Sequence, residues 1–168
     1  CPYTNDDDIV NNVKAIYTKT GVMPMVLCNT NAEIAPLNKK LRQICNPIGA
    51  KPYSSAVCME YYGTEWRYQD WRFGVGDSVI NITNKYESDK NGKTYLQVAN
   101  GEIGTVVRAK GVEVTVRFET NVVFDIAQDN SLRPAYALTV NKAQGSEYPT
   151  VIVKAACTWG DKRERFYT

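Results

Sequence analysis

The sequence predicts an α/β domain that is built on a parallel sheet and interrupted by a small, separate β-barrel. Near both ends of the chain, short apolar runs suited to buried strands alternate with segments whose apolar residues recur at helical spacing. Between about residues 74 and 128 the pattern changes to short segments with period-2 alternation, bounded by turn residues. We therefore assign residues 1–73 and 129–168 to the α/β domain and residues 74–128 to the inserted barrel.

The first helix is predicted over residues 6–19. Asn5 is a preferred N-cap, and the acids that follow it, Asp6 to Asp8, lie where the helix dipole favours negative charge. Gly21 is suited to end the helix. The acid run could also be interpreted as a metal cluster, but consecutive helical residues point in different directions, so a solvated helix start is the better interpretation. The apolar stripe is Ile9, Val10, Val13, Ile16 and Tyr17.

A strand over residues 23–28 and a helix over residues 32–45 are expected next. The strand is short and apolar, as in a buried parallel sheet. Pro36 is expected in the first turn of the helix, where its missing N–H has little effect, and Asn46-Pro47 should end the helix. The helical face contains Ile34, Leu37, Leu41 and Ile44.

Residues 48–72 show no clean period but are rich in aromatic side chains. Interleaved with Arg67 and Arg72, these aromatics could stack the bases of a single strand. Packing of a loop against a neighbouring domain is the simpler explanation, and we prefer it. The aromatic residues are Tyr53, Tyr61, Tyr62, Trp66, Tyr68 and Trp71.

The predicted barrel contains short strands separated by turn residues. Asn100-Gly101 and Gly104 are expected to supply turns with positive φ. Asn91 to Thr94 contain the Gly-Lys-Thr of a phosphate loop, but the leading Gly is replaced by Glu87 and the flanks are polar, so a hairpin turn is predicted. The strands are expected at residues 77–83, 96–99, 104–109, 113–118 and 122–126.

The α/β pattern returns with a strand over residues 135–138. Thr139 should cap a helical turn over residues 140–144, which Gly145 breaks before a strand over residues 150–155. Because the first N–H groups of a helix lack intrahelical partners, this arrangement can direct them at a phosphate. Lys142 adds a positive charge on the same turn. From the spacing alone, an ordinary strand–helix connection in which Thr139 only caps the helix is the alternative interpretation.

The amino-acid sequences of several segments resemble motifs of superfamily 1 DNA helicases of the 5′→3′ class. Motif V is matched at seven positions, with the Gly-Ser-Glu ending of the RecD and conjugative-helicase branch and an Asn-Lys pair more like the Pif branch. The segment from Leu27 to Pro47 is similar to motif IV, and residues 73–106 resemble the SH3-like insertion of RecD-type helicases. The final residues, 163–168, resemble the start of motif VI. The motif V positions are Thr139, Asn141, Lys142, Gln144, Gly145, Ser146 and Glu147.

The resemblance implies a second RecA-like domain without a phosphate loop, interrupted by an SH3-like β-barrel. By this resemblance one set of residues holds single-stranded DNA and another faces the nucleotide. The expected DNA-binding residues are Thr30, Asn31, Thr139, Asn141 and Lys142. The expected nucleotide-facing residues are Gln144, Gly145, Glu147 and Arg163, although Arg163 could equally be part of a solvated terminal charge cluster. No metal ligand is expected.

The resemblance also implies cofactors and partners. ATP and Mg²⁺ would be bound in the full-length parent, and none by this fragment alone, because the phosphate loop, its Lys and the Mg²⁺ carboxylate are absent from the sequence. The start at Cys1 and the end within a motif are expected for a fragment of a longer chain. Its partners would be single-stranded DNA and the upstream first RecA-like domain of the same chain. Subunits of a recombination or repair complex form a further expected partner class.

Composition limits the alternatives. The 168 residues are 43% hydrophobic and 23% charged, as in a folded globular protein, and the net charge of +2 confines any nucleic-acid site to a local patch. The chain has no histidine, and its five cysteines form no Cys-x-x-Cys pair, which excludes a Cys/His zinc site. Cys28 and Cys157 are expected to be buried strand residues. An odd cysteine count and the lack of an apolar run of about 20 residues favour a cytoplasmic protein without a membrane span.

Two other functions remain open from the sequence. The barrel could make the chain a nucleic-acid-binding or protein-binding module without motor activity, and a phosphate loop upstream would decide against that. A viral-type RNA helicase of the same superfamily would be separated by assays on duplex substrates.

Overall fold

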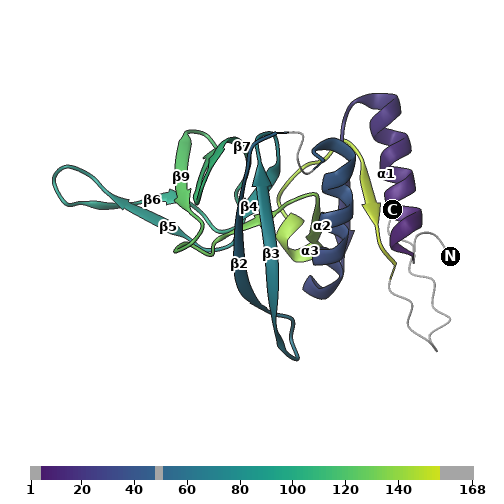
Figure 1. The fold of residues 1–168 in the computed structure, drawn as a ribbon, viewed down its shortest axis with the longest axis horizontal. Coiled ribbons are helices and arrows are strands. Elements are labelled where there is room, and N and C mark those ends of the chain that lie inside the picture. The colour runs from purple at the N-terminus through teal and green to yellow at the C-terminus, as the bar shows by residue number, and fades with distance from the viewer. Residues whose placement is uncertain (1–4, 48–50, 156–168) are drawn as a thin grey trace.

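The computed structural model describes residues 5–47 and 51–155 (Figure 1). The helices are α1 (Asp6–Thr20), α2 (Asn31–Cys45) and α3 (Val140–Ala143). The strands are β1 (Met25–Cys28), β2 (Tyr53–Tyr61), β3 (Trp66–Gly74), β4 (Ser78–Asn81), β5 (Lys85–Ser88), β6 (Thr94–Val98), β7 (Ile103–Lys110), β8 (Glu113–Arg117), β9 (Asn121–Asp125), β10 (Leu132–Pro134), β11 (Ala137–Thr139) and β12 (Val151–Val153). In Figure 1 the parallel sheet with α1 and α2 lies to the right and the antiparallel strands to the left.

The α/β part contains the predicted parallel sheet, with strand order β11-β1-β12. Alternate residues of β1 face opposite ways: Val26 and Cys28 pack in one core cluster with residues of α1 and α2, whereas Met25 packs in another with Ile80 of β4. Both helices therefore cover one face of the sheet, and the antiparallel strands approach the other. Cys28 is fully buried in β1, as expected, and this burial raises the pKa of its thiol to about 12. Cys157 lies outside the described residues.

Local signals fixed the ends of the helices. The Asn5 side chain accepts a hydrogen bond from the Asp7 N–H at the start of α1, and Gly21 ends that helix in the left-handed region. The prediction for Pro36 was wrong. Because α2 begins at Asn31, Pro36 lies in its second turn, where its missing N–H leaves one carbonyl of the helix without its usual donor. Pro36 is exposed, so water can reach this side of the helix.

The largest difference from the sequence-based expectation is in residues 53–74. Instead of a loop, β2 and β3 form a long antiparallel hairpin in which Tyr53 pairs with Gly74 and Tyr61 with Trp66. The hairpin stands beside α2 (Figure 1). Trp71 and Phe73 from β3 are buried in the core of the antiparallel sheet. The aromatic residues of this segment therefore divide between the core and an exposed face.

Short antiparallel strands occupy the region where a barrel was predicted. A five-stranded sheet has the order β10-β4-β7-β8-β9, and β5 pairs with β6 in a separate hairpin. Four of the predicted strands match β4, β7, β8 and β9, and β6 is close to the fifth. The described residues form small sheets and no closed barrel, so the SH3-like insertion stays a prediction. The five-stranded sheet also includes β10, beyond residue 128.

Gly101 has the predicted positive φ, at 96°, but Gly104 does not. Gly104 lies within β7, where an added Cβ would stand 2.6 Å from Val116 Cγ1 and 2.8 Å from the Arg117 carbonyl oxygen. The prediction of a turn at Gly104 was therefore wrong. The glycine is needed for close packing between β7 and β8.

The Gly-Lys-Thr sequence lies in a hairpin turn, as predicted. Gly92 has a φ of 78° in the turn between β5 and β6, and the Asp89 carboxylate accepts hydrogen bonds from the N–H groups of Asn91 and Lys93. These backbone donors are therefore already bound to a carboxylate. The hairpin extends away from the rest of the molecule at the far left of Figure 1.

A buried polar network joins the α/β part to the antiparallel part. Arg42 Nε of α2 lies 2.8 Å from Asp77 Oδ2, and both side chains are more than nine-tenths buried. Asp77 also accepts hydrogen bonds from Asn46 Nδ2, from the Tyr136 hydroxyl and from the Gly74 N–H. Burial, together with the neighbouring Asp77 charge, raises the pKa of Tyr136, so its hydroxyl remains a donor.

Asn38 makes a second connection from α2. Its Nδ2 donates to the carbonyl oxygens of Pro134 and Ala137, and its Oδ1 accepts from the N–H groups of Tyr136 and Ala137. The segment that leaves the antiparallel sheet and enters the parallel sheet is thus held by its backbone.

None of the described helices has the length and apolar character of a membrane span. Within residues 5–47 and 51–155, no three His, Cys, Asp or Glu side chains gather as metal ligands. The acids at the start of α1 instead include Asp6 and Asp7, which pair with Lys154 and Lys40.

We predict that Asp77→Ala will lower the free energy of unfolding by about 3–5 kcal/mol, because it leaves the Arg42 guanidinium buried without its counter-charge. Chemical denaturation followed by circular dichroism will measure the change. The matched control is Asp70→Ala, which removes an ion pair to Arg72 whose partners are both more than a third exposed. This control should cost less than about 1 kcal/mol, and equal effects of the two changes would contradict the role assigned to burial.

Gly104→Ala should lower the free energy of unfolding by about 1–3 kcal/mol, because the new methyl group overlaps a backbone carbonyl that cannot rotate away. The same denaturation measurement tests this prediction. Unchanged stability would show that the two strands can separate without loss.

Candidate nucleic-acid interface

Two neighbouring strand ends bring the predicted DNA-binding residues to one edge of the parallel sheet. β1 and β11 run parallel, with Cys28 paired to Thr139, so their carboxyl ends meet there. Asn31 begins α2 directly after β1, and Thr139 is the N-cap of α3 directly after β11. The edge therefore carries two helix starts side by side.

Around α3 the local structure agrees with the sequence-based prediction. Thr139 Oγ1 accepts from the Lys142 N–H at 3.4 Å, a long cap bond, and Gly145 has a φ of 83° after the turn. The Lys142 side chain has a partner that the sequence did not indicate: its Nζ donates to Asn100 Oδ1 at 2.6 Å. Since Asn100 lies in the turn between β6 and β7, Lys142 links the two parts of the fold. Asn141 is exposed beside it.

Thr30 is held by a carboxylate. Both its N–H and its hydroxyl lie 3.1 Å from Glu33 Oε2. A phosphate at this position would meet the negative charge of Glu33, and the Thr30 hydroxyl already has an acceptor. The local electrostatics therefore favour the Thr139 end of this edge over the Thr30 end as a place for an anion.

The predicted nucleotide-facing residues are only partly brought together. Gln144, Gly145 and Glu147 are exposed on the segment after α3, and Arg163 lies outside the described residues. Gln144 lines a hollow of about 660 Å³ between this segment and the β6–β7 turn, together with Asn141 and Lys142. Glu147 does not line that hollow. The structure thus places Gln144 next to residues that were assigned to DNA.

A second hollow, which we call the hairpin cavity, lies between α2, the β2–β3 hairpin and β11. Its volume is about 380 Å³. Its wall includes three of the predicted DNA-binding residues, Asn31, Thr139 and Lys142. The other lining residues are Ile34, Ala35, Asn38, Met59, Glu60, Tyr61, Trp66, Trp71, Ile80, Ile82, Arg133, Pro134, Ala137 and Leu138.

Aromatic side chains line the hairpin cavity near the hairpin turn. The Tyr61 and Trp66 rings lie 5.3 Å apart at an interplanar angle of 44°. Trp66 is 63% exposed, although it lines the cavity. Sequence reasoning singled out these aromatics but missed the hairpin that pairs them. In the sequence, Gly63 was a local signal for the turn, where its φ is 85°.

The buried polar groups of the hairpin cavity are already bound to protein partners. Glu60 accepts from Trp71 Nε1 at 2.6 Å and from the Tyr62 hydroxyl at 2.7 Å, and it forms an ion pair with Arg133. Burial and the hydrogen bond to Glu60 raise the pKa of Tyr62, which keeps its proton at neutral pH. The negative charge of Glu60 is thus balanced inside the protein.

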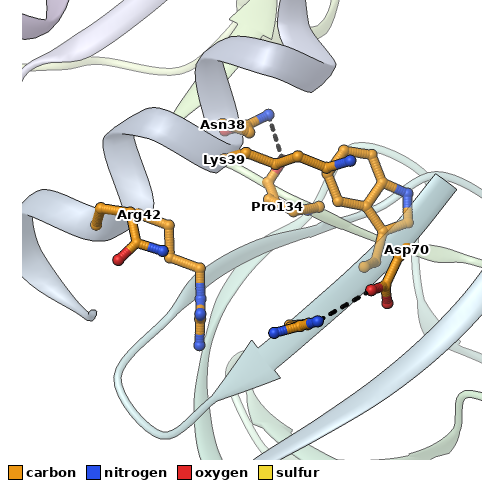
Figure 2. A pocket seen from close by; sticks show the side chains of 8 residues that line it. Asn38, Lys39, Arg42, Asp70 and Pro134 are labelled. Carbon is orange, nitrogen blue, oxygen red and sulfur yellow. Dashed lines mark hydrogen bonds and ion pairs between the residues drawn. The ribbon is translucent and has the colours of Figure 1, made fainter. Parts of the chain in front are cut away.

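A smaller cavity of about 270 Å³ continues along α2 toward its carboxyl end. Figure 2 shows Lys39 and Arg42 from α2 on one side of it and Asp70 from β3 on the other. Lys39 Nζ lies 5.4 Å from the centre of the Trp71 ring and donates to Gln69. The Arg42 and Arg72 charges are paired with Asp77 and Asp70, so Lys39 supplies most of the positive charge here.

Comparison with known proteins shows similarity to helicases in sequence and in fold. Residues 134–168 match the family described as the UvrD-like helicase C-terminal domain. Over 78 residues the chain is 40% identical to the ATP-dependent RecD2 DNA helicase of Deinococcus radiodurans. The aligned segment covers 46% of this chain and 10% of that protein. The fold of this chain is similar to that of the Pif1 helicase from Bacteroides in complex with ADP-AlF3 and single-stranded DNA, with a TM-score of 0.50 and 15% identity. The match covers 92% of this chain and 40% of the Pif1 chain.

The Bacteroides Pif1 structure bound to single-stranded DNA gives the same picture, with a TM-score of 0.50, 15% identity and coverage of 90% of this chain and 43% of that chain. At this level of identity the structures show a shared fold. The chain therefore spans about a tenth of the RecD2 relative and about two-fifths of the Pif1 chains. Its sequence is therefore similar to helicases in two places, and its fold is similar to part of the Pif1 helicase.

Proposed function

We propose that the chain is the second RecA-like domain of an ATP-dependent DNA helicase and that it holds the backbone of single-stranded DNA. The observation that carries this proposal is the meeting of two strand ends at one sheet edge, where Asn31, Thr139 and Lys142 line a common cavity. The relative in Deinococcus is named as a DNA helicase, which favours DNA over RNA. The similar Pif1 structures contain single-stranded DNA, in agreement with a strand-binding role.

The chemistry of this edge suits phosphate and not base recognition. The first N–H groups of α3 lack partners within the helix, and Lys142 on the same turn adds a full positive charge. Such contacts position a strand without reading its sequence. The net charge of +2 agrees with a local site, since a generally basic surface is not needed. We assign Asn141 to the same DNA-binding site. Thr30 is assigned a weaker role, because its hydroxyl is bound to the negatively charged Glu33.

The described residues do not fit ATP and Mg²⁺ by themselves. Gln144 and Glu147 offer an amide and a carboxylate, but the Gly92 turn, which carries the Gly-Lys-Thr sequence, has its N–H groups bound to Asp89. We therefore assign ATP and Mg²⁺ to the upstream first RecA-like domain of the parent protein. Gln144, Gly145, Glu147 and Arg163 are proposed to form one wall of the cleft between the two domains. Movement along the strand in the 5′→3′ direction belongs to the same proposal.

The antiparallel region is proposed to be the SH3-like insertion of a RecD-type helicase. The parent protein is proposed to be cytoplasmic. The period-2 strands and the positive φ of Gly101 support this assignment. Subunits of a recombination or repair complex are proposed as further partners of the parent.

In the full-length protein, Lys142→Ala should weaken binding of single-stranded DNA and reduce the slope of log affinity against log salt by roughly 0.7 for the lost phosphate contact. Thr139→Ala should also weaken binding, and it should cost about 1 kcal/mol of stability as a lost cap. Fluorescence anisotropy with a labelled oligonucleotide at several salt concentrations measures the DNA affinity and its salt slope. Chemical denaturation measures the change in stability.

The matched control is Asn100→Ala, which removes the protein partner of Lys142 but leaves its charge in place. This variant should keep the salt slope of the unaltered protein. If Asn100→Ala and Lys142→Ala have the same effect, Lys142 is a structural link and not a phosphate ligand.

A further prediction concerns ATP hydrolysis. The isolated chain should show no hydrolysis above background, and Lys93→Ala in the full-length protein should leave hydrolysis unchanged, because Lys93 lies in an exposed hairpin turn. A phosphate-release assay with Mg²⁺ present tests both statements. Hydrolysis by the isolated chain that Lys93→Ala abolishes would show that the Gly-Lys-Thr sequence binds phosphate after all.

A further inference from the structure

We propose that the hairpin cavity receives one unstacked base of the bound single strand and that Trp66 and Tyr61 form the platform on which this base stacks. The proposal rests on the proposed function, because Asn31, Thr139 and Lys142, which line the cavity, are the residues assigned to the DNA backbone. It adds a base-binding element, the β2–β3 hairpin, which neither the sequence motifs nor the comparisons assign.

The cavity has the size and lining of a site for a flat organic group. Its volume of about 380 Å³ lies within the range of about 300–1,000 Å³ found for small-molecule sites. Besides the aromatic pair, the lining contains apolar residues from α2, from β4 and the residue that follows it, and from β11. These apolar residues are Ile34, Ala35, Ile80, Ile82 and Leu138.

The positions of the three polar lining residues determine which part of a DNA strand can enter the cavity. Asn31, Thr139 and Lys142 line the same cavity as Trp66, so a strand whose phosphates lie at these polar residues has its bases within reach of the aromatic pair. The charge inside the cavity is balanced, because Glu60 is paired with Arg133. A phosphate gains little by entering such a space, whereas a neutral aromatic base gains contact with apolar walls.

The polar groups in the interior of the cavity, Asn38, Glu60 and Arg133, are already bound and are not free to tell one base from another. Asn38 uses both its amide hydrogens and both oxygen lone pairs on backbone atoms. Glu60 is occupied by Trp71, Tyr62 and Arg133, and the Arg133 guanidinium also donates to the carbonyls of Asn130 and Leu132. Recognition by stacking alone accepts every base, which suits a protein that moves along any sequence.

Exposure of Trp66 agrees with this role. A side chain that is 63% exposed contributes little to the core, and the adjacent Tyr61 is 52% exposed. Both can therefore be changed without loss of the fold. The neighbouring Tyr68 is 74% exposed on the same strand as Trp66 but does not line the cavity, which makes it a matched control.

The test uses the full-length protein and fluorescein-labelled oligodeoxythymidine, with affinity measured by anisotropy at several salt concentrations. Trp66→Ala should weaken binding at least about fivefold without changing the salt slope, because a stacking contact and not a phosphate contact is lost. Trp66→Phe should restore most of the affinity, and Tyr68→Ala should bind like the unaltered protein. Oligodeoxyadenosine and oligodeoxycytidine should show the same loss with Trp66→Ala.

A second measurement separates this inference from the proposed function. On an oligonucleotide with abasic sites throughout, Trp66→Ala and the unaltered protein should bind equally, while Lys142→Ala should still show its reduced salt slope. Unchanged affinity of Trp66→Ala and Tyr61→Ala for oligodeoxythymidine would overturn the stacking platform, and a salt effect of Lys142→Ala would then leave the proposed function standing. If Lys142→Ala has no effect either, both the platform and the phosphate site fail.

Discussion

The buried ion pair between Arg42 and Asp77 is the interaction on which the arrangement of the molecule depends. A carboxylate that is removed from water must be balanced by a counter-charge and by hydrogen-bond donors within the protein. Asp77 does so by binding groups from α2, from the end of β3 and from Tyr136. Its position therefore sets the distance between α2 and the antiparallel strands. The hairpin cavity lies between two of the elements that Asp77 joins, α2 and the β2–β3 hairpin.

Much of the α/β part could be predicted because its signals are local. The Asn5 cap, the left-handed Gly21 and the short buried run of β1 each depend on neighbouring residues, and all are found in the structure. The β2–β3 hairpin could not be predicted in this way. Its inward positions include the buried Ser54 and the partly buried Glu60, which are held by specific polar contacts and not by apolar character. A search for hydrophobic alternation therefore finds no strand there.

The candidate interface shows the same division. The juxtaposition of Asn31 and Thr139 follows from a general property of parallel sheets, because the carboxyl ends of adjacent strands lie at one edge. The contact of Lys142 with Asn100 and the pairing of Glu60 with Arg133 join residues that are far apart in the sequence. Only the folded chain reveals such pairs, and here they decide which charges remain free to meet a ligand.

Asn38 shows how the architecture can persist while the sequence around it changes. Each of its four hydrogen bonds ends on a main-chain atom of the segment from Pro134 to Ala137, and none depends on the side chains of that segment. Substitution along the segment is therefore limited by packing and leaves the attachment intact. The restriction falls on position 38 itself, since an aspartate there would turn a carboxylate oxygen toward two carbonyls. One asparagine at this position therefore holds the segment whatever side chains the segment carries.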